Sequence, residues 1–262
     1  MRSVTSRDNP AFRQALLVAT SSRERKRTGS SFIEGIHLCR AYRERFGVPQ
    51  CIVLTAQALA HPEVAALLEP NAGILQVSDA LFRELSQVEN GIGIAYVIAT
   101  PAPPLPQRIG DDCVYLDRLQ DPGNVGTVLR TCAGAGVGRV LTAPHTVFCW
   151  SPKVIRAGMG AHFMLDIHEG VPWQQACRRF RLPVMATSAG AAATIYETDL
   201  RGPRVWLFGN EGAGLPADFE EPALQWVSIP QNPAVESLNV ATAAAICLFE
   251  QLRQRRAGAR GC

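Results

Sequence analysis

The sequence predicts an α/β protein built from two units, and three observations support this fold class. Short apolar stretches typical of buried strands alternate with longer stretches of helical character along most of the chain. The 262 residues are 47% hydrophobic and 19% charged, which is enough for a core and too little charge for disorder. Four prolines within residues 100–106 exclude a helix or central strand there. We therefore expect one domain over residues 1–106, ending in this proline-rich linker, and a second over 107–262.

The first domain alternates helices with strands, which predicts a small α/β layer structure. Its helices are expected over residues 10–22, 34–46, 62–68 and 79–85, and its strands over 51–55, 74–77 and 93–98.

The second domain repeats the alternation in longer units. Its strands are expected over residues 113–116, 139–141, 164–167, 183–187, 205–208 and 224–229, and its helices over 124–135, 151–159, 173–180 and 237–255. This order predicts a mostly parallel sheet with helices on both faces. Ligands of such sheets bind at the loops that leave the carboxyl ends of the strands, so we expect the chemistry in those loops.

Two glycine-rich loops differ in what they can bind. Residues 134–138 follow a helix and precede a strand, the reverse of the order that phosphate binding requires, so we interpret them as a helix C-terminal turn. Residues 209–214 have the glycine spacing of a phosphate-binding loop, but Leu215 and Pro216 stand where its Lys and Ser or Thr belong. What remains is a tight loop from which Glu211 projects. It is either a structural turn or a loop whose amides approach a ligand.

A third loop, residues 121–126, leads into a helix. Asn124 is expected to cap this helix. Arg130 follows the apolar Val128 and Leu129 and is expected to be buried. A buried guanidinium requires an acidic or phosphate partner, so Arg130 is a candidate functional residue.

Positive charge is concentrated near the N-terminus. Residues 1–45 hold ten basic and four acidic side chains, a balance of +6 in a chain of net charge +3. Of the 26 basic residues, 24 are arginine, whose planar fork suits phosphate. The basic run at residues 23–27 either contacts an RNA backbone or is a solvated face produced by arginine-rich coding. The candidate RNA-contacting residues are Arg7, Arg23, Arg25, Lys26 and Arg27.

Other classes of protein are not expected. The eight cysteines are scattered without a C-x-x-C pair, and no histidine lies at zinc-finger spacing, so we expect free thiols in a reducing cytoplasm and no metal site. The N-terminus lacks the apolar stretch of a signal peptide, and the apolar run Val240–Phe249 is too short to span a bilayer. We therefore expect neither a secreted nor a membrane protein.

Four sequence blocks stand out in the second domain. They are LDRLQDPGNVGTVLRTCAGAGVGRVL (116–141), SPKVIRAGMGAHF (151–163), LFGNEGAGLP (207–216) and SIPQNPAVESLNVATAAAICLFE (228–250). Their order and spacing resemble the SpoU (TrmH) family of RNA ribose 2′-O-methyltransferases over most of residues 113–252. The first 100 residues, with the start SRDNPAF, resemble the small ribosomal-protein-like substrate-binding domain that many members carry.

The resemblance implies the SPOUT α/β fold with a trefoil knot in the second domain, S-adenosylmethionine as cofactor, and a homodimer. By motif match, the cofactor-binding residues would be Gly209, Ile229 and Leu238, together with the turn Thr187, Ser188 and Ala189. The catalytic and RNA-contacting positions of the family fall on Asn124, Arg130, Glu211, Ser237 and Asn239.

The implied activity is methylation of a ribose 2′ hydroxyl in structured RNA, with ribosomal RNA favoured over tRNA. Two alternatives stay open: a noncatalytic RNA-binding module of the same fold, and a SPOUT methyltransferase that acts on a tRNA base. Because a guanidinium resists losing its proton, we expect Arg130 to hold a phosphate and stabilise charge on the 2′ oxygen. Gln231, Pro233 and Gly158 depart from the family pattern, which bears on substrate choice more than on methyl transfer.

Overall fold

The computed structural model describes residues 1–262 except 70, 90, 216–218, 220–223 and 260–262. The chain forms two compact units. Unit 1 comprises Met1–Pro101 and Trp150–Phe163, and unit 2 comprises Ala102–Cys149 and Met164–Cys262. The division therefore falls five residues before the expected boundary at residue 106. Residues 150–163, expected in the second domain, pack within unit 1, where the Phe163 and Tyr42 rings meet at a centroid distance of 5.7 Å.

Unit 1 contains a mixed five-stranded sheet with the strand order β1-β4-β3-β5-β2. The strands are β1 (Arg2–Val4), β2 (Ser30–Glu34), β3 (Cys51–Thr55), β4 (Gly73–Val77) and β5 (Ile94–Ala99). Strands β1, β4 and β3 are parallel, whereas β5 is antiparallel to both β3 and β2. The expected α/β layer is confirmed, but β1 and β2 were not anticipated.

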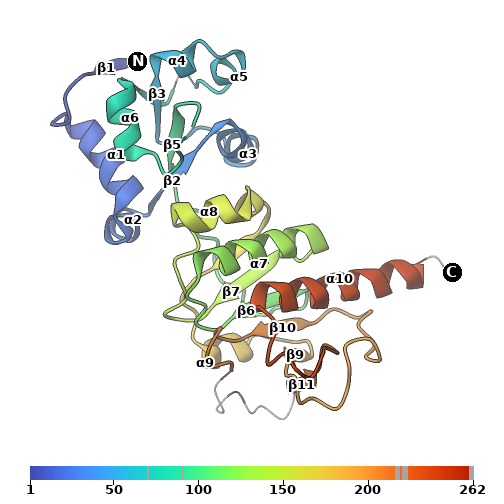
Figure 1. Ribbon diagram of the computed structural model, residues 1–262. Helices are drawn as coiled ribbons and strands as arrows, with labels where there is room; N and C mark the ends of the chain where they lie inside the picture. Colours follow the sequence, from blue (N-terminus) through green and yellow to red (C-terminus); the bar gives the residue numbers. More distant parts are fainter. Residues whose placement is uncertain (70, 90, 216–218, 220–223, 260–262) are drawn as a thin grey trace. The chain divides into compact units, whose positions relative to one another are not determined.

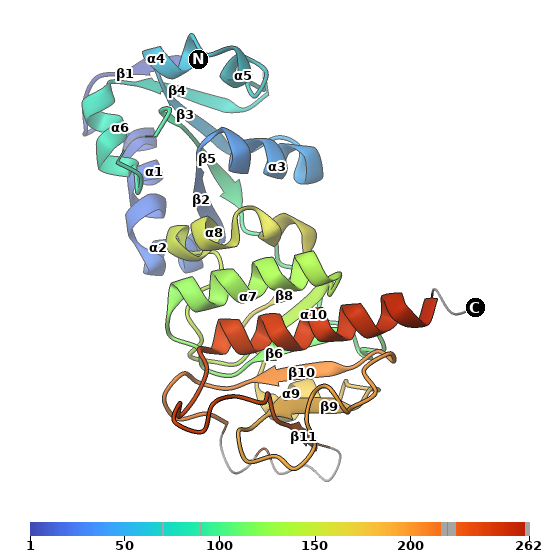
Figure 2. The same ribbon diagram turned by 45° about the vertical axis from the view of Figure 1, so that its right-hand side comes forward.

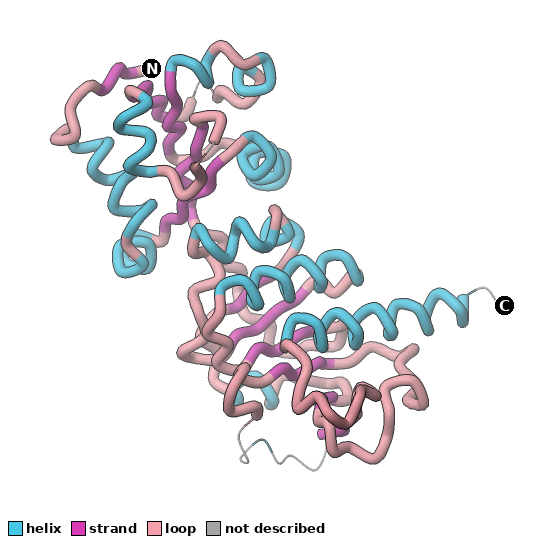
Figure 3. The backbone as a smooth tube through the Cα atoms, viewed as in Figure 1, coloured by secondary structure: helices cyan, strands magenta, loops and turns pink. Residues whose placement is uncertain are grey.

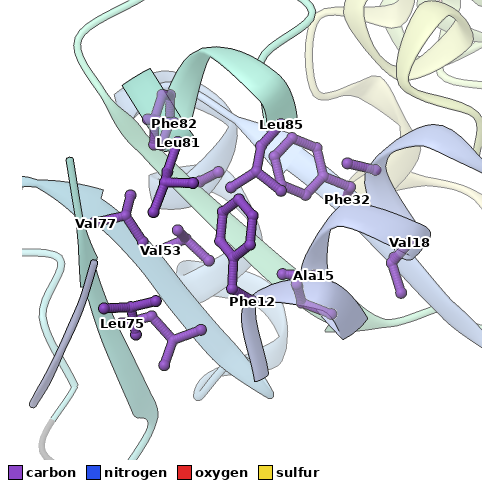
Figure 4. Close-up of a cluster of buried hydrophobic side chains, with 14 residues drawn as sticks. Phe12, Ala15, Val18, Phe32, Val53, Leu75, Val77, Leu81, Phe82 and Leu85 are labelled. Carbon is purple, nitrogen blue, oxygen red and sulfur yellow. The ribbon is translucent and has the colours of Figure 1, made fainter. Parts of the chain in front are cut away.

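The helices of unit 1 are α1 (Pro10–Thr20), α2 (Ser22–Thr28), α3 (Ile36–Phe46), α4 (Ala56–Leu59), α5 (Pro62–Ala65), α6 (Asp79–Leu85) and α8 (Pro152–Gly158). A single helix over residues 10–22 was expected, but the chain breaks at Ser21, whose Oγ accepts a hydrogen bond from the Glu24 amide and caps α2. Figure 4 shows the core formed where α1 and α6 cover the sheet, with Phe12, Phe32 and Leu85 at its centre.

Unit 2 contains a six-stranded sheet with the order β11-β9-β10-β6-β7-β8, and every neighbouring pair is parallel. The strands are β6 (Cys113–Leu116), β7 (Arg139–Thr142), β8 (Asp166–His168), β9 (Val184–Thr187), β10 (Val205–Phe208) and β11 (Leu224–Val227). The central strands β6 and β10 are buried along their whole length, as expected for a sheet covered on both faces.

Helices lie on both faces of this sheet, as the sequence predicts. On one face, α7 (Pro122–Ala135) and α10 (Val240–Ala259) lie side by side (Figures 1 and 2). There the Trp206 indole Nε1 donates a 2.7 Å hydrogen bond to Gln251 Oε1 of α10. On the other face, the Tyr115 ring contacts Trp173 of α9 (Trp173–Cys177) at 5.3 Å. No helix in the described part of the chain is long and apolar enough to cross a membrane.

A polar network fixes the C-terminal half of α10 to the sheet. Arg255 forms an ion pair with Asp112, which directly precedes β6. The Gln251 Nε2 amide donates to Asp112 Oδ1 at 3.0 Å, and Gln251 is only 1% exposed. Because Gln251 also accepts from Trp206, the buried amide is satisfied at both ends. This network orients the helix whose first turn lies at the candidate site.

Two long segments of unit 2, residues 188–204 between β9 and β10 and residues 228–239 between β11 and α10, are loops without a regular helix (Figure 3). A third loop follows β10 and closes tightly on itself, since the Asn210 and Gly214 backbones exchange hydrogen bonds at 3.1 and 2.9 Å. A Cβ at Gly209 would lie 2.6 Å from the Gly214 carbonyl carbon, so this turn requires glycine.

Candidate active site

The candidate site lies at the carboxyl ends of β9, β10 and β11, as the parallel sheet predicts. A cavity of about 700 Å³ opens there. Its lining includes Asn124 in the first turn of α7, Gly209 and Glu211 after β10, and Ser237, Leu238 and Asn239 after β11, all of them predicted site residues. A smaller cavity of about 140 Å³ shares Thr187, Ser188, Ser237 and Leu238 with it and is also lined by Ala189 and Ile229. The structure thus brings together every predicted catalytic and cofactor residue except Arg130.

Three polar side chains form a continuous hydrogen-bonded chain across the larger cavity. Asn239 Nδ2 donates to Asn124 Oδ1 at 2.9 Å, and Asn124 Nδ2 donates to Glu211 Oε1 at 3.2 Å. Asn239 Oδ1 accepts from the amides of Ala241 and Thr242 at 2.9 and 3.2 Å, which caps the first turn of α10. We call Asn239, Asn124 and Glu211 the amide relay. It joins residues that are 115 positions apart in the sequence.

The direction of the amide relay is fixed at both ends. The Glu211 carboxylate can only accept, so Asn124 must present its NH₂ group to Glu211 and its oxygen to Asn239. The N–H groups at the start of α10 can only donate, so Asn239 must turn its oxygen to the helix and its NH₂ group to Asn124. One Asn239 amide hydrogen and one Asn124 oxygen lone pair remain unused by these bonds. The relay therefore offers a donor and an acceptor next to each other at the cavity.

Glu211 fixes the loop between β6 and α7. Its carboxylate accepts the backbone amides of Gln120 at 3.2 Å and Asp121 at 3.1 Å, at the positive N-terminal end of α7. Partial burial alone raises the pKa of the Glu211 carboxyl. The hydrogen bonds from its own amide, from Asn124 and from these two backbone amides outweigh that effect, so its pKa is lowered overall. Glu211 is therefore an ionised anchor for the Gln120–Asp121 turn.

Asn124 is not the helix cap that the sequence predicts. Asp121 occupies that position, and its Oδ1 accepts the Asn124 amide at 2.8 Å, while Pro122 begins the helix. An acidic residue before a proline is a recognised helix start, so this signal was present in the sequence. Capping by Asp121 leaves the Asn124 side chain available for the amide relay. Gln120 and Asp121 are thus site-forming residues that the sequence interpretation missed.

Arg130 is exposed, so its predicted burial is wrong. The buried positions of α7 include Val125, Val128, Leu129 and Cys132, and Arg130 lies between them on the outer face of the helix. In the described part of the chain, no acidic side chain forms a salt bridge with Arg130 within 4.0 Å. Its guanidinium therefore stays available to an anion from outside the chain.

Three of the six predicted cofactor-binding residues, Gly209, Ile229 and Leu238, lie on loops after strands β10 and β11. Among the described residues, the backbone N–H and C=O groups of Gly209, Ile229 and Leu238 form no hydrogen bond to each other or to neighbouring loops. All three residues line one of the two cavities. Unpaired backbone groups next to a cavity need a ligand or water as partner. These positions therefore suit a ligand recognised mainly through main-chain donors and acceptors.

The five predicted RNA-contacting residues lie in unit 1 and differ in their surroundings. Arg7 is exposed and pairs with Glu84 at 2.9 Å, and Arg27 pairs with Glu24. Arg23 and Lys26 are exposed on α2. Arg25 is a correction, because it is only 4% exposed and its guanidinium donates to the Val18 and Ala19 carbonyls at 2.7 and 3.0 Å and to Ser22 Oγ at 2.8 Å. Arg25 satisfies the C-terminal end of α1 and does not face RNA.

The cysteines contribute nothing visible to this site. Seven of them are free thiols, and Cys262 lies outside the described residues. Where they are fully buried, as at Cys132, burial raises the thiol pKa well above its usual range. No group of three potential metal ligands occurs among the described residues.

Comparisons with known proteins agree with this arrangement. The model of the SpoU rRNA methylase family matches residues 112–249, and that of the MRM3-like substrate binding domain matches residues 4–95. An uncharacterized tRNA/rRNA methyltransferase of Synechocystis is 32% identical over 97% of this chain and 94% of its own length. The 23S rRNA (guanosine(2553)-2′-O)-methyltransferase RlmP of Bacillus subtilis is 27% identical over 87% of this chain and 91% of its own.

A solved structure is similar over both units. The AdoMet-bound rRNA methyltransferase from Sinorhizobium meliloti is 27% identical, covers 96% of this chain and 97% of its own, and superposes with a TM-score of 0.84. The family model covers more than half of the chain and includes every residue of the amide relay. The chain belongs to the SpoU rRNA methylase family.

Proposed function

We propose that this protein transfers a methyl group from S-adenosylmethionine to a ribose 2′ hydroxyl of ribosomal RNA. The amide relay carries the proposal, because it places an unused donor and an unused acceptor beside a cavity with free main-chain groups. Family membership and the 23S rRNA activity in the name of the Bacillus subtilis relative support the same reaction. An intact relay argues against a noncatalytic RNA-binding module.

The two adjoining cavities fit the cofactor. The smaller one is lined by Ile229 and Leu238 and by three residues that carry hydroxyl groups, Thr187, Ser188 and Ser237. Neutral polar walls of this kind suit an adenosine moiety, and the AdoMet-bound relative superposes over both units. When bound, S-adenosylmethionine supplies an electrophilic methyl group on a sulfonium. The trefoil knot that the family resemblance implies remains part of this proposal.

The side chains of the amide relay then bind and orient the ribose. The spare Asn239 amide hydrogen donates to one ribose oxygen, and the spare Asn124 lone pair accepts from a ribose hydroxyl. Holding the hydroxyl in line with the methyl group removes much of the entropic barrier to transfer. Ser237, at the wall shared by both cavities, lies where cofactor and ribose meet. Arg130 holds a neighbouring phosphate and stabilises negative charge that develops on the 2′ oxygen.

Arg130 reaches such a phosphate through a second copy of the chain. Its face of α7 continues one turn on to Gly134, where an added Cβ would lie 3.6 Å from Cζ of Phe249 on α10. Phe249 is 48% exposed. It lines a cavity of about 600 Å³ with Leu252, Arg253, Arg256 and Ala257. Burying this aromatic surface in a homodimer would bring Arg130 to the interface, and light scattering should give twice 28.4 kDa.

Unit 1 supplies RNA affinity. It matches a substrate-binding domain model and carries the concentrated positive charge of the N-terminus. Arg7, Arg23, Lys26 and Arg27 are its candidate phosphate contacts. Because Arg7 and Arg27 have carboxylate partners, Arg23 is the best placed of them to bind phosphate directly. Residence in the cytoplasm, where ribosomal RNA is modified, is part of the proposal.

The test is methyl transfer in vitro with the full chain, tritiated S-adenosylmethionine and unmodified ribosomal RNA in excess chelator. The label should appear in a 2′-O-methylnucleoside after digestion, without added metal. An Asn239→Ser protein serves as the matched control. Label recovered in a base, label only on tRNA, or transfer that needs a divalent ion would each reject the proposal.

A further inference from the structure

Trp226 differs from the other three tryptophans of the chain. Trp150, Trp173 and Trp206 are at most 6% exposed and each contacts another ring. Trp226 is 41% exposed and has no ring contact or indole hydrogen bond to another described residue. Single exposed apolar side chains are common on protein surfaces, so the exposure of Trp226 alone does not indicate a function. Its position in the fold does.

The indole lines the same cavity as the amide relay. Trp226 is the third residue of β11, in register with Ala186 of β9, near the end of the strand that faces the site. The cavity of about 700 Å³ includes Trp226, Asn124 and Asn239 in its wall, whereas the smaller cavity does not include Trp226. Trp226 therefore shares a cavity with the two side chains that hold the ribose in the proposed function.

We propose that Trp226 stacks on the base of the nucleotide whose ribose is methylated; this rests on the proposed function. The base is attached to the ribose that Asn124 and Asn239 hold, so it must enter the same cavity. Proteins read an unpaired RNA base by stacking it on an aromatic side chain, and every base offers a π-face. Trp226 thus selects an unstacked nucleotide without selecting its identity, and it is a substrate-binding residue.

The neighbouring Gln225 provides a matched control. It is exposed on the same strand, but its side chain points to the opposite face of the sheet and lines neither cavity. Four full-length proteins are compared: wild type, Trp226→Ala, Trp226→Phe and Gln225→Ala. Each is assayed for methyl transfer to unmodified ribosomal RNA, for cofactor affinity by calorimetry, for mass by light scattering, and for quenching of tryptophan fluorescence by the same RNA.

Loss of one stacked base should raise the apparent KM of Trp226→Ala for RNA about ten- to a hundredfold. Trp226→Phe should recover most of this loss, and Gln225→Ala should match the wild type. Cofactor affinity and mass should be equal in all four. RNA should quench the fluorescence of the wild-type protein and not that of Trp226→Phe, since the other three indoles are buried.

Three results for Trp226→Ala would overturn the stacking role. The first is an unchanged KM for RNA. The second is a matching loss of cofactor affinity, which would place the indole at the cofactor, and the third is a halved mass, which would place it at a subunit contact. Failure of the proposed function looks different. In that case the wild-type protein transfers no methyl group to ribose, while the quenching experiment still reports whether RNA reaches Trp226.

Discussion

Asn239 has two separable roles, and substitutions at this position can distinguish them. Its Oδ1 caps α10, whereas its Nδ2 donates to Asn124 and leaves one hydrogen for the ribose. Alanine removes both functions. Serine and aspartate both keep an oxygen that can cap a helix, but neither has an amide hydrogen to donate.

The expected magnitudes follow from these contacts. Loss of the cap in Asn239→Ala should lower the free energy of unfolding by about 1 kcal/mol, whereas serine and aspartate should stay within a few tenths. A hydrogen bond of this kind contributes about 0.5–1.5 kcal/mol, and both the relay bond and the ribose bond are lost in all three variants. Together the two losses amount to about 1–3 kcal/mol, so methyl transfer should fall at least about fivefold in each. The Asn239→Asp protein should be the slowest, because its carboxylate and Asn124 Oδ1 are both acceptors and would face each other. If the Asn124 amide turned over, its oxygen would instead face the Glu211 carboxylate.

The assay combines thermal unfolding with methyl transfer at saturating cofactor. The prediction is that stability separates alanine from serine, while activity does not. An Asn239→Ser protein with activity within about twofold of the wild type would refute the relay, because its cap is intact and only the NH₂ group that reaches Asn124 is missing. A destabilised Asn239→Ser protein would show instead that the cap assignment is wrong.

Three further predictions concern other parts of the molecule. Arg130→Ala should leave cofactor affinity unchanged and slow methyl transfer about a hundredfold. Arg130→Lys should restore little of this loss, because lysine lacks the planar guanidinium. Near wild-type turnover of Arg130→Ala would show that Arg130 has no part in the mechanism. Arg25→Ala should lower the free energy of unfolding, measured by calorimetry, by about 2–4 kcal/mol, since two backbone carbonyls of α1 lose a charged donor. Arg23 is exposed, so Arg23→Ala should change the same free energy by less than about 0.5 kcal/mol. Equal effects of the two substitutions would contradict the capping role of Arg25. Burial raises the pKa of Asp112, but the hydrogen bonds from Arg255, the Arg204 amide and Gln251 outweigh burial, so the pKa is lowered overall. The stabilisation by ionised Asp112 is therefore present above the ordinary carboxyl pKa and is lost as the pH falls through the lowered one. The difference in melting temperature between the wild type and Asp112→Asn should shrink as the pH falls, and a difference that does not change with pH would contradict this role.

Strands and helices with a clear pattern could be predicted from the sequence. The strand at 113–116, the strand at 205–208 and the helix at 79–85 have the expected bounds because apolar runs and turn residues delimit them. Strand β2 was missed because Ser30 and Ser31 open it directly after a basic helix, and tertiary burial outweighs their weak strand preference. The break between α1 and α2 was missed because helical residues continue on both sides of Ser21.

The site required information that periodicity does not contain. Asn124, Glu211 and Asn239 meet only because three loops converge at one edge of the sheet, and no local pattern encodes contacts across 87 and 115 positions. The family resemblance supplied these residues. Where local reasoning was used, at Asn124 as a cap and Arg130 as a buried cation, the outcome was wrong, since Asp121 competes better for the cap and Arg130 falls outside the buried stripe of α7.

The most direct test of the proposed activity is a map of 2′-O-methylated riboses in ribosomal RNA from cells with and without the gene for this protein. A ribose methyl group on ribosomal RNA should disappear in the deletion strain, return with the wild-type gene, and return to a smaller extent with the Asn239→Ser gene. An unchanged ribosomal RNA map, or loss of a methyl group only from tRNA or from a base, would contradict the proposed activity.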